Sequence, residues 1–169
     1  MASPAGGRTA ALSLQLSRAH QDLRLRLADV RSHLGRPRPD GDTLLTHCLA
    51  FCTALTNHHQ GEDSGLFTQL LHERPDLVPT VAKLVEDHGF ISAILARVRD
   101  LAEQAAHLSD ADPARLEAIG RELDGLAAIM DSHFGYEERA IGAALDAGVP
   151  DDGWSDPVLR FAAPQNPPS

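Results

Sequence analysis

Two short segments place a histidine four residues before a glutamate: His58 precedes Glu62, and His133 precedes Glu137. Both segments lie in stretches whose apolar spacing predicts helix, where residues i and i+4 project from one face, one turn apart. Each pair therefore offers an imidazole and a carboxylate to one point in space, which is the spacing of metal ligands. A charged carboxylate within an apolar stripe is costly unless it is paired or bound to a metal. Two such pairs indicate a shared, buried two-metal centre.

Four helical segments must position these pairs, because proline and glycine divide the chain at three places. The breaks lie at 35–41, 74–76 and 109–113. At the last break, Ser109 or Asp112 can cap a helix whose first turn contains Pro113. We expect helices at 10–34, 42–73, 77–108 and 113–146. Four amphipathic helices joined by short connections predict an all-α fold, an antiparallel up-down-up-down four-helix bundle.

The length of 169 residues suits one domain with a substantial core. We expect a flexible N-terminus at 1–9, the bundle at 10–146 and an irregular Pro-rich C-terminal tail at 147–169. Within that tail, Trp154 is a candidate to hold part of the chain against the bundle.

Composition and charge exclude several classes of partner. The formal net charge is −9, which disfavours binding to nucleic acid or anionic lipid, and no Lys/Arg cluster overrides it. The chain shows no signal-peptide apolar region and no run of about 18 apolar residues that could span a membrane. The two cysteines, Cys48 and Cys52, suit a reducing compartment. We therefore expect a soluble, cytoplasmic protein without a nucleic-acid or membrane partner.

In each predicted helix one histidine interrupts the apolar stripe, and in two helices a glutamate follows one turn later. The inward-pointing set is His20, His58, Glu62, His88, His133 and Glu137. Counted in residues from the helix ends, His20 and His58 lie at similar heights along the axis of an antiparallel bundle. The same holds for His88 and His133. No Lys or Arg lies on any of the four stripes, so a metal is the expected partner of the two glutamates.

The remaining histidines receive other interpretations. Off the stripes lie His33, His59, His72 and His107. His59 and Asp63 are also four residues apart, but their stripe is more polar, so we place both at the bundle edge. His47 lies about 16 Å along the helix axis from His58, too far to bind the same centre. We interpret His47 and the two nearby cysteines as core or helix-edge packing.

The ligand types indicate which metal the centre holds. Imidazole and carboxylate without a thiolate suit iron, manganese or zinc, and carboxylates that can bridge suit a dinuclear site. We favour two iron ions over manganese or zinc. Two bridging glutamates and two histidines per ion leave room for a bridging oxo or hydroxo group and one open position on each ion.

The six-residue pattern on four consecutive helices resembles the hemerythrin-like (HHE cation-binding) domain over roughly residues 10–146. The resemblance implies a four-helix bundle with a non-haem, oxo- or hydroxo-bridged di-iron centre that binds O2 or related small molecules. It also implies ligand roles: His20 and His58 hold one iron, His88 and His133 hold the other, and Glu62 and Glu137 bridge them.

One departure from the pattern bears on the reaction. Oxygen-carrying hemerythrins have a second histidine one turn from the histidine on the third helix, and here Leu84 and Ser92 stand at the two possible positions. With an open position on both irons, a small oxidant could bridge them. We therefore expect a protein that reduces or disproportionates peroxide, NO or O2, with an electron donor that the sequence does not identify. The alternative is a non-catalytic carrier or sensor of O2, NO or iron.

Overall fold

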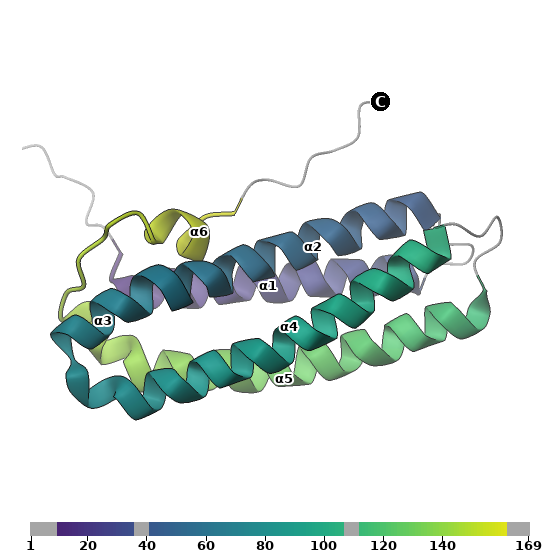
Figure 1. Ribbon diagram of the computed structural model, residues 1–169. Coiled ribbons are helices and arrows are strands. Elements are labelled where there is room, and N and C mark those ends of the chain that lie inside the picture. The colour runs from purple at the N-terminus through teal and green to yellow at the C-terminus, as the bar shows by residue number, and fades with distance from the viewer. Residues whose placement is uncertain (1–9, 36–40, 107–111, 162–169) are drawn as a thin grey trace, which may run out of the picture.

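The computed structural model describes residues 10–35, 41–106 and 112–161. The flexible N-terminus expected at 1–9 lies outside the described residues. Four long helices make up most of the structure (Figure 1): α1 (Leu12–Leu34), α2 (Gly41–Gly61), α4 (Val78–Ala106) and α5 (Pro113–Asp146). The short elements are a π-helical turn (Glu62–Leu66), α3 (Phe67–Glu73), a 3-10 turn (Pro75–Leu77) and α6 (Ser155–Leu159). The described residues contain no strand, which confirms the all-α prediction.

The helix ends follow the predicted signals, with one interruption. Asp112 caps α5, because its Oδ1 accepts a hydrogen bond from the Ala114 amide at 3.0 Å and Pro113 occupies the first helical position. The helix expected over 42–73 is interrupted by the π-helical turn, where each backbone bond spans one more residue than in an α-helix. That turn begins at Glu62, one of the predicted metal ligands.

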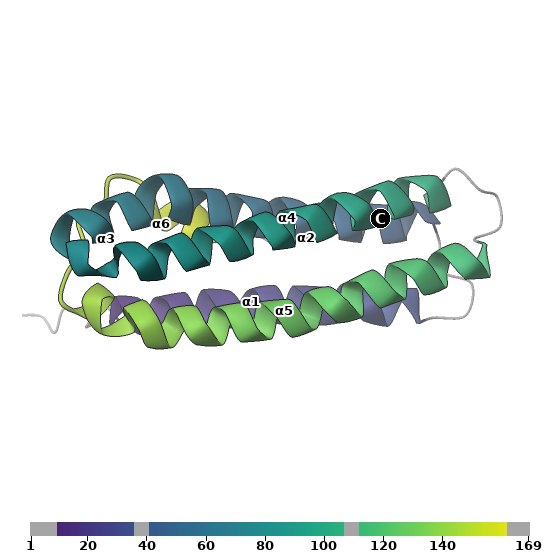
Figure 2. The same ribbon diagram turned by 60° about the horizontal axis from the view of Figure 1, so that its bottom comes forward.

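The long helices lie side by side in two layers, α1 with α5 and α2 with α4 (Figures 1 and 2). Contacts join α1 to α5, α2 to α4, α4 to α5 and α1 to α2. As a result, α2 packs against two of the other long helices and buries a wide arc of its surface. Among the described residues, no helix combines the length and apolarity needed to cross a membrane.

The core consists of two apolar clusters along the bundle. The first includes Leu23, Phe51, Leu55, Ile91 and Met130. The second includes Leu16, Leu66, Leu84, Ile141, Trp154 and Val158. On every long helix a predicted ligand lies between a member of one cluster and a member of the other, as His20 does between Leu16 and Leu23. The predicted ligands therefore form a polar layer between two apolar ones.

The cysteine pair belongs to the first cluster. Cys48 and Cys52 are buried and unoxidised. Burial raises the pKa of the Cys48 thiol to about 12 and that of the Cys52 thiol to about 11. Both thiols are therefore protonated and unreactive at neutral pH, and the packing interpretation is confirmed for them.

The C-terminal segment differs from the irregular tail expected over 147–169, because it contains α6, which packs on α1 and α2. Trp154 is buried, and its Nε1 donates a hydrogen bond to the Pro150 carbonyl at 2.8 Å. Two glycines permit the close approach: a Cβ at Gly61 would lie 2.9 Å from Pro157 Cγ, and one at Gly65 would lie 2.5 Å from Trp154 Cβ. Burial of Trp154 and Val158 on this glycine surface explains why the segment is ordered. The part of the tail from residue 162 lies outside the described residues.

Candidate metal centre

The structure brings together all six residues predicted as ligands, and it adds His59. Every member is buried, with exposed fractions between 0% and 6%. Potential ligand atoms within 4.8 Å of one another form two groups. The inner group comprises His20, His58, Glu62 and Glu137. The outer group comprises His59, Glu62, His88 and His133.

Glu62 belongs to both groups, and its two oxygens face different histidines. Oε1 lies 2.9 Å from Nε2 of His58, and Oε2 lies 3.2 Å from Nε2 of His88. A carboxylate in this position can place one oxygen on each of two cations. Glu137 lies similarly between the groups, since its Oε2 is 3.4 Å from Nε2 of His20 and 3.7 Å from Nε2 of His133.

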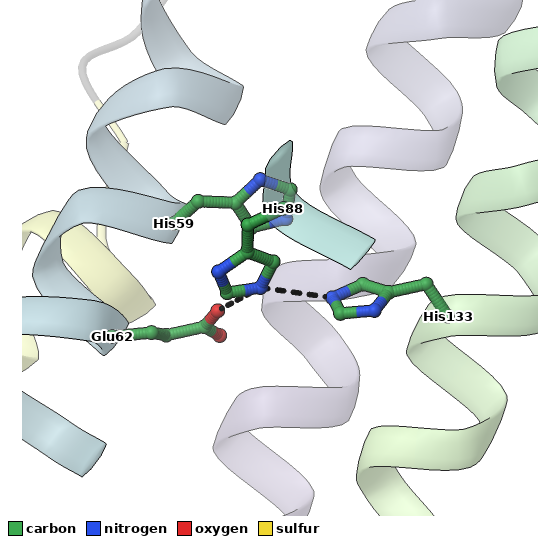
Figure 3. Close-up of side chains that lie close together, drawn as sticks. All are labelled: His59, Glu62, His88 and His133. Carbon is green, nitrogen blue, oxygen red and sulfur yellow. Dashed lines mark hydrogen bonds and ion pairs between the residues drawn. The ribbon is translucent and has the colours of Figure 1, made fainter. Parts of the chain in front are cut away.

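The outer group is shown in Figure 3, where His88 points toward both Glu62 and His133. Nε2 of His88 and Nε2 of His133 are 3.0 Å apart. Two nitrogen ligands about 2.1 Å from one octahedral ion, at right angles, are separated by about 3.0 Å. The pair therefore already has the spacing of neighbouring ligands on a single ion.

His59 corrects the sequence analysis, which placed it at the bundle edge. The side chain is buried, and its ring stacks on that of His88 with centroids 3.9 Å apart. The prediction was wrong because α2 contacts both α1 and α4, so adjacent residues on α2 can both point into the bundle. Burial and the neighbouring His88 hold the pKa of His59 well below its ordinary value. Its ring is therefore neutral, with a lone pair to offer.

Four histidines have their Nδ1 atoms held by acceptors outside the two groups. These contacts are His20 to Glu138 Oε1 at 2.8 Å, His58 to the Val158 carbonyl at 2.8 Å, His88 to Asp63 Oδ1 at 2.7 Å, and His133 to Asp87 Oδ2 at 3.2 Å. Such acceptors fix the tautomer and the ring orientation of metal-binding histidines. Each ring therefore directs Nε2 toward the centre. The sequence analysis identified none of these orienting contacts.

Unpartnered polar atoms test whether a cation fits here. Within the described part of the chain, seven buried side-chain atoms lack a hydrogen-bond partner: Nε2 of His20, His58 and His59, and both carboxylate oxygens of Glu62 and Glu137. Buried polar groups are almost always satisfied, whereas the carboxylates of Glu62 and Glu137 have only ion-pair contacts with imidazoles. All seven atoms belong to the inner or outer group, so a cation bound there would satisfy them together.

The electrostatics of the layer point the same way. Burial lowers the pKa of His20, but contacts with Glu137, Glu138 and Glu62 outweigh it and raise that pKa to about 10. Burial and the Glu62 carboxylate raise the pKa of Glu137 to about 7. Burial also opposes ionisation of Glu62, yet His58 and its other histidine neighbours hold the Glu62 pKa well below the usual range. The layer thus concentrates negative charge that requires bound protons or a cation.

Together, the fold and the site define a helical-bundle protein with a buried His/Glu centre suited to cations. The family model of the hemerythrin HHE cation-binding domain matches residues 13–145, and the chain belongs to this family. This finding confirms the resemblance drawn from the six-residue pattern. Searches of curated proteins and of solved structures returned no match.

Proposed function

We propose that this protein holds a dinuclear non-haem iron centre and binds a small oxidant such as O2, NO or peroxide. The position of Glu62 carries the proposal, because its two oxygens face histidines of different groups. Iron suits the mixed imidazole and carboxylate donors better than metals that prefer thiolate or all-oxygen sites. An antiparallel up-down-up-down order of the four long helices is part of the proposal, and the few residues that separate α1 from α2 and α4 from α5 in the sequence support it.

His59 changes which reaction the ligand set favours. With His59, the outer group contains three histidines, whereas the inner group contains two. His59 thus stands in for the histidine that Leu84 and Ser92 fail to supply. An ion held by the inner group would then have fewer protein ligands than one held by the outer group, which would favour binding of a small ligand at the inner ion alone. We therefore favour a carrier or sensor over an enzyme that consumes the oxidant.

The residues around the inner group shield it from water. His20, His58 and Glu137 are fully buried, and the Phe134 ring stacks on His20 with centroids 3.9 Å apart and planes 8° from parallel. Iron held by His20, His58, Glu62 and Glu137 would supply redox chemistry toward a small oxidant. The surrounding apolar side chains exclude water, and Glu138 holds the His20 proton on Nδ1 so that Nε2 can act as a ligand.

Metal analysis with an optical spectrum tests the centre itself. Aerobically purified protein should contain about two irons per chain and absorb in the near-ultraviolet, as an oxygen-bridged diferric pair does and zinc does not. A preparation that binds a single iron, or only zinc, would contradict the dinuclear iron proposal.

A comparison of wild type with His59→Ala tests the reaction. The reduced wild type should give a long-lived spectrum on addition of O2 or NO, with little turnover of peroxide. His59→Ala opens a position on the outer ion, so it should consume peroxide or NO at least tenfold faster while it retains iron. His72→Ala is the control, because His72 is exposed and pairs only with its neighbour Glu73 among the described residues. Rapid consumption by the wild type, unchanged in His59→Ala, would favour the enzyme.

A further inference from the structure

A second cluster of metal-binding side chains lies on the outside of the bundle. Asp29 and His33 come from α1, and His47 comes from α2. His33 follows His20 by 13 residues on the same helix, so the cluster lies about 20 Å along the axis from the buried layer. It shares no residue with the inner or outer group.

The three side chains converge on a common point. One ligand atom from each lies within 4.8 Å of the others. The Asp29 carboxylate lies between the imidazoles: Oδ1 is 3.8 Å from His33 Nδ1, and Oδ2 is 3.7 Å from His47 Nδ1. The two rings are 4.1 Å apart between centroids. Neither histidine is needed for the core, since both rings are partly exposed.

His33 is oriented as a ligand would be. Its Nδ1 donates a hydrogen bond to the Asp29 main-chain carbonyl at 2.9 Å. A carbonyl can only accept, so the proton of the neutral ring lies on Nδ1 and the lone pair lies on Nε2. The same device, an N–H donated to a backbone carbonyl, fixes histidines in known metal sites.

We propose that Asp29, His33 and His47 bind one divalent first-row transition ion, for which Zn²⁺ is the probe. Two imidazoles and one carboxylate are a ligand set that zinc accepts, with water in the fourth position. Ligands of tetrahedral zinc lie about 3.3 Å apart, so small movements of these partly exposed side chains can bring Asp29, His47 and Nε2 of His33 to that spacing. Asp29 and His47 also line a surface cavity of about 220 Å³, through which water can reach the ion. Bound metal would tie α1 to α2, independently of the buried centre.

Zinc binding by the iron-loaded protein tests this site. Isothermal titration and equilibrium dialysis should show one Zn²⁺ taken up per chain with no release of iron. His33→Ala and His47→Ala should each weaken that uptake at least tenfold and leave the iron content unchanged. His72→Ala is the matched control, since its side chain is 84% exposed and its only carboxylate contact among the described residues is Glu73. Zinc should also raise the melting temperature of the wild type but not that of His47→Ala.

Three outcomes would overturn the proposal. Uptake that persists in both histidine variants would place the zinc elsewhere. An equal loss in His72→Ala would indicate nonspecific binding to surface histidines. Release of one iron for each zinc bound would show that zinc enters the buried centre instead. Circular dichroism of each variant confirms that the helices are intact, and half-exposed positions such as His47 tolerate alanine without loss of a core contact.

Discussion

The inner and outer groups share Glu62 but differ in what surrounds them. The inner histidines are held by the Glu138 carboxylate and by the Val158 carbonyl, a neutral acceptor. Two of the three outer histidines, His88 and His133, are held by the carboxylates of Asp63 and Asp87, whose side chains are 36% and 17% exposed. His58 is therefore held by a packed segment, whereas His20, His88 and His133 are held by carboxylates near solvent.

This difference separates two ways of stabilising a metal ligand. Carboxylate partners increase the basicity of a histidine, and near the surface they are partly screened by water and salt. A carbonyl in a packed segment carries no net charge, but it is insensitive to salt and depends on the docking of that segment. We expect both halves to respond to charge changes, and only the inner half, through His58, to respond to changes in the packing of α6.

Glu62→Ala should have the largest effect, because it removes the only residue common to both groups. Iron content should fall from about two per chain to nearly none, and the melting temperature should approach that of chelator-treated protein. Metal analysis and thermal denaturation measure both effects. Glu86→Ala, at an exposed position on α4, should change neither. Retention of a full iron complement by Glu62→Ala would exclude the bridging role.

Displacing α6 should weaken the inner half alone. In Gly65→Val the new side chain would collide with Trp154, since even a Cβ would lie 2.5 Å from the Trp154 Cβ. His58 would then lose its carbonyl partner, and loss of such a partner typically costs about 10- to 100-fold in metal affinity. Stepwise chelator titration should show one of the two irons weakened by that factor. Gly125→Val is the control, because a Cβ there meets nothing within 4 Å. Equal weakening of both irons would break the distinction between the halves.

Asp87→Asn should have a smaller effect, confined to the outer half. The amide oxygen can still accept from His133 Nδ1, but the charge is lost, so we expect about a tenfold weakening of the outer iron. The Asp87 carboxylate also pairs with Lys83 on the same helix, which the variant releases to solvent. The effect should shrink at high salt, and the exposed Asp100→Asn should show none. A salt-independent effect of equal size on both irons would contradict the electrostatic account.

The smallest expected effect is the release of protons from the two groups when metal binds. Contacts with carboxylates outweigh burial and raise the pKa of His20 to about 10 and that of His88 to about 9. Both rings are therefore protonated at pH 7 in the metal-free protein and must lose that proton to bind a cation. Burial and the nearby His88 lower the pKa of His133 to about 4, so it releases none. Each half should thus release a histidine proton, measured with an indicator dye as Fe²⁺ is added to weakly buffered protein.

The raised pKa of His20 also determines how the stability of the metal-free protein changes with pH. The pairing that raises the pKa of His20 from 6.5 to about 10 stabilises the metal-free fold fully below pH 6.5 and is lost as the pH rises through 10. Metal affinity should change in the opposite direction, rising with pH because protons compete for the same nitrogen. A metal-free protein that becomes more stable between pH 7 and 10 would show that His20 is not paired in this way.

The residues that interrupt apolar stripes were predictable from the sequence, because spacing alone reveals them. His20 and His88 each stand where a leucine or isoleucine is expected, and the structure buries both in the polar layer. Their role as metal ligands stays a prediction. His59 was missed because a single stripe was assigned to α2, although that helix packs against two of the other long helices. Two adjacent histidines before a glutamate were the available signal.

The orienting contacts could not be predicted in the same way. Asp63 and Asp87 are exposed enough to pass for ordinary surface carboxylates, and only the packing of α2 against α4 and of α4 against α5 brings them to their histidines. The Val158 carbonyl is a main-chain atom 100 residues from His58, so no side-chain pattern could indicate it. Gly61 and Gly65, four residues apart on one helical face, were the only local sign that another segment packs there.

The docking of α6 also determines the order in which the centre is completed during synthesis. A ribosome produces His20, His58, His59, Glu62 and His88 first, then His133 and Glu137, and only afterwards the segment that carries Val158. A nascent chain that has just emerged through α5 has all seven side chains of the two groups, but the His58 ring still lacks its acceptor. At that stage the inner group would lack one of its orienting contacts, whereas His88 and His133 of the outer group already have theirs. Docking of α6 would therefore complete the inner group after the outer group.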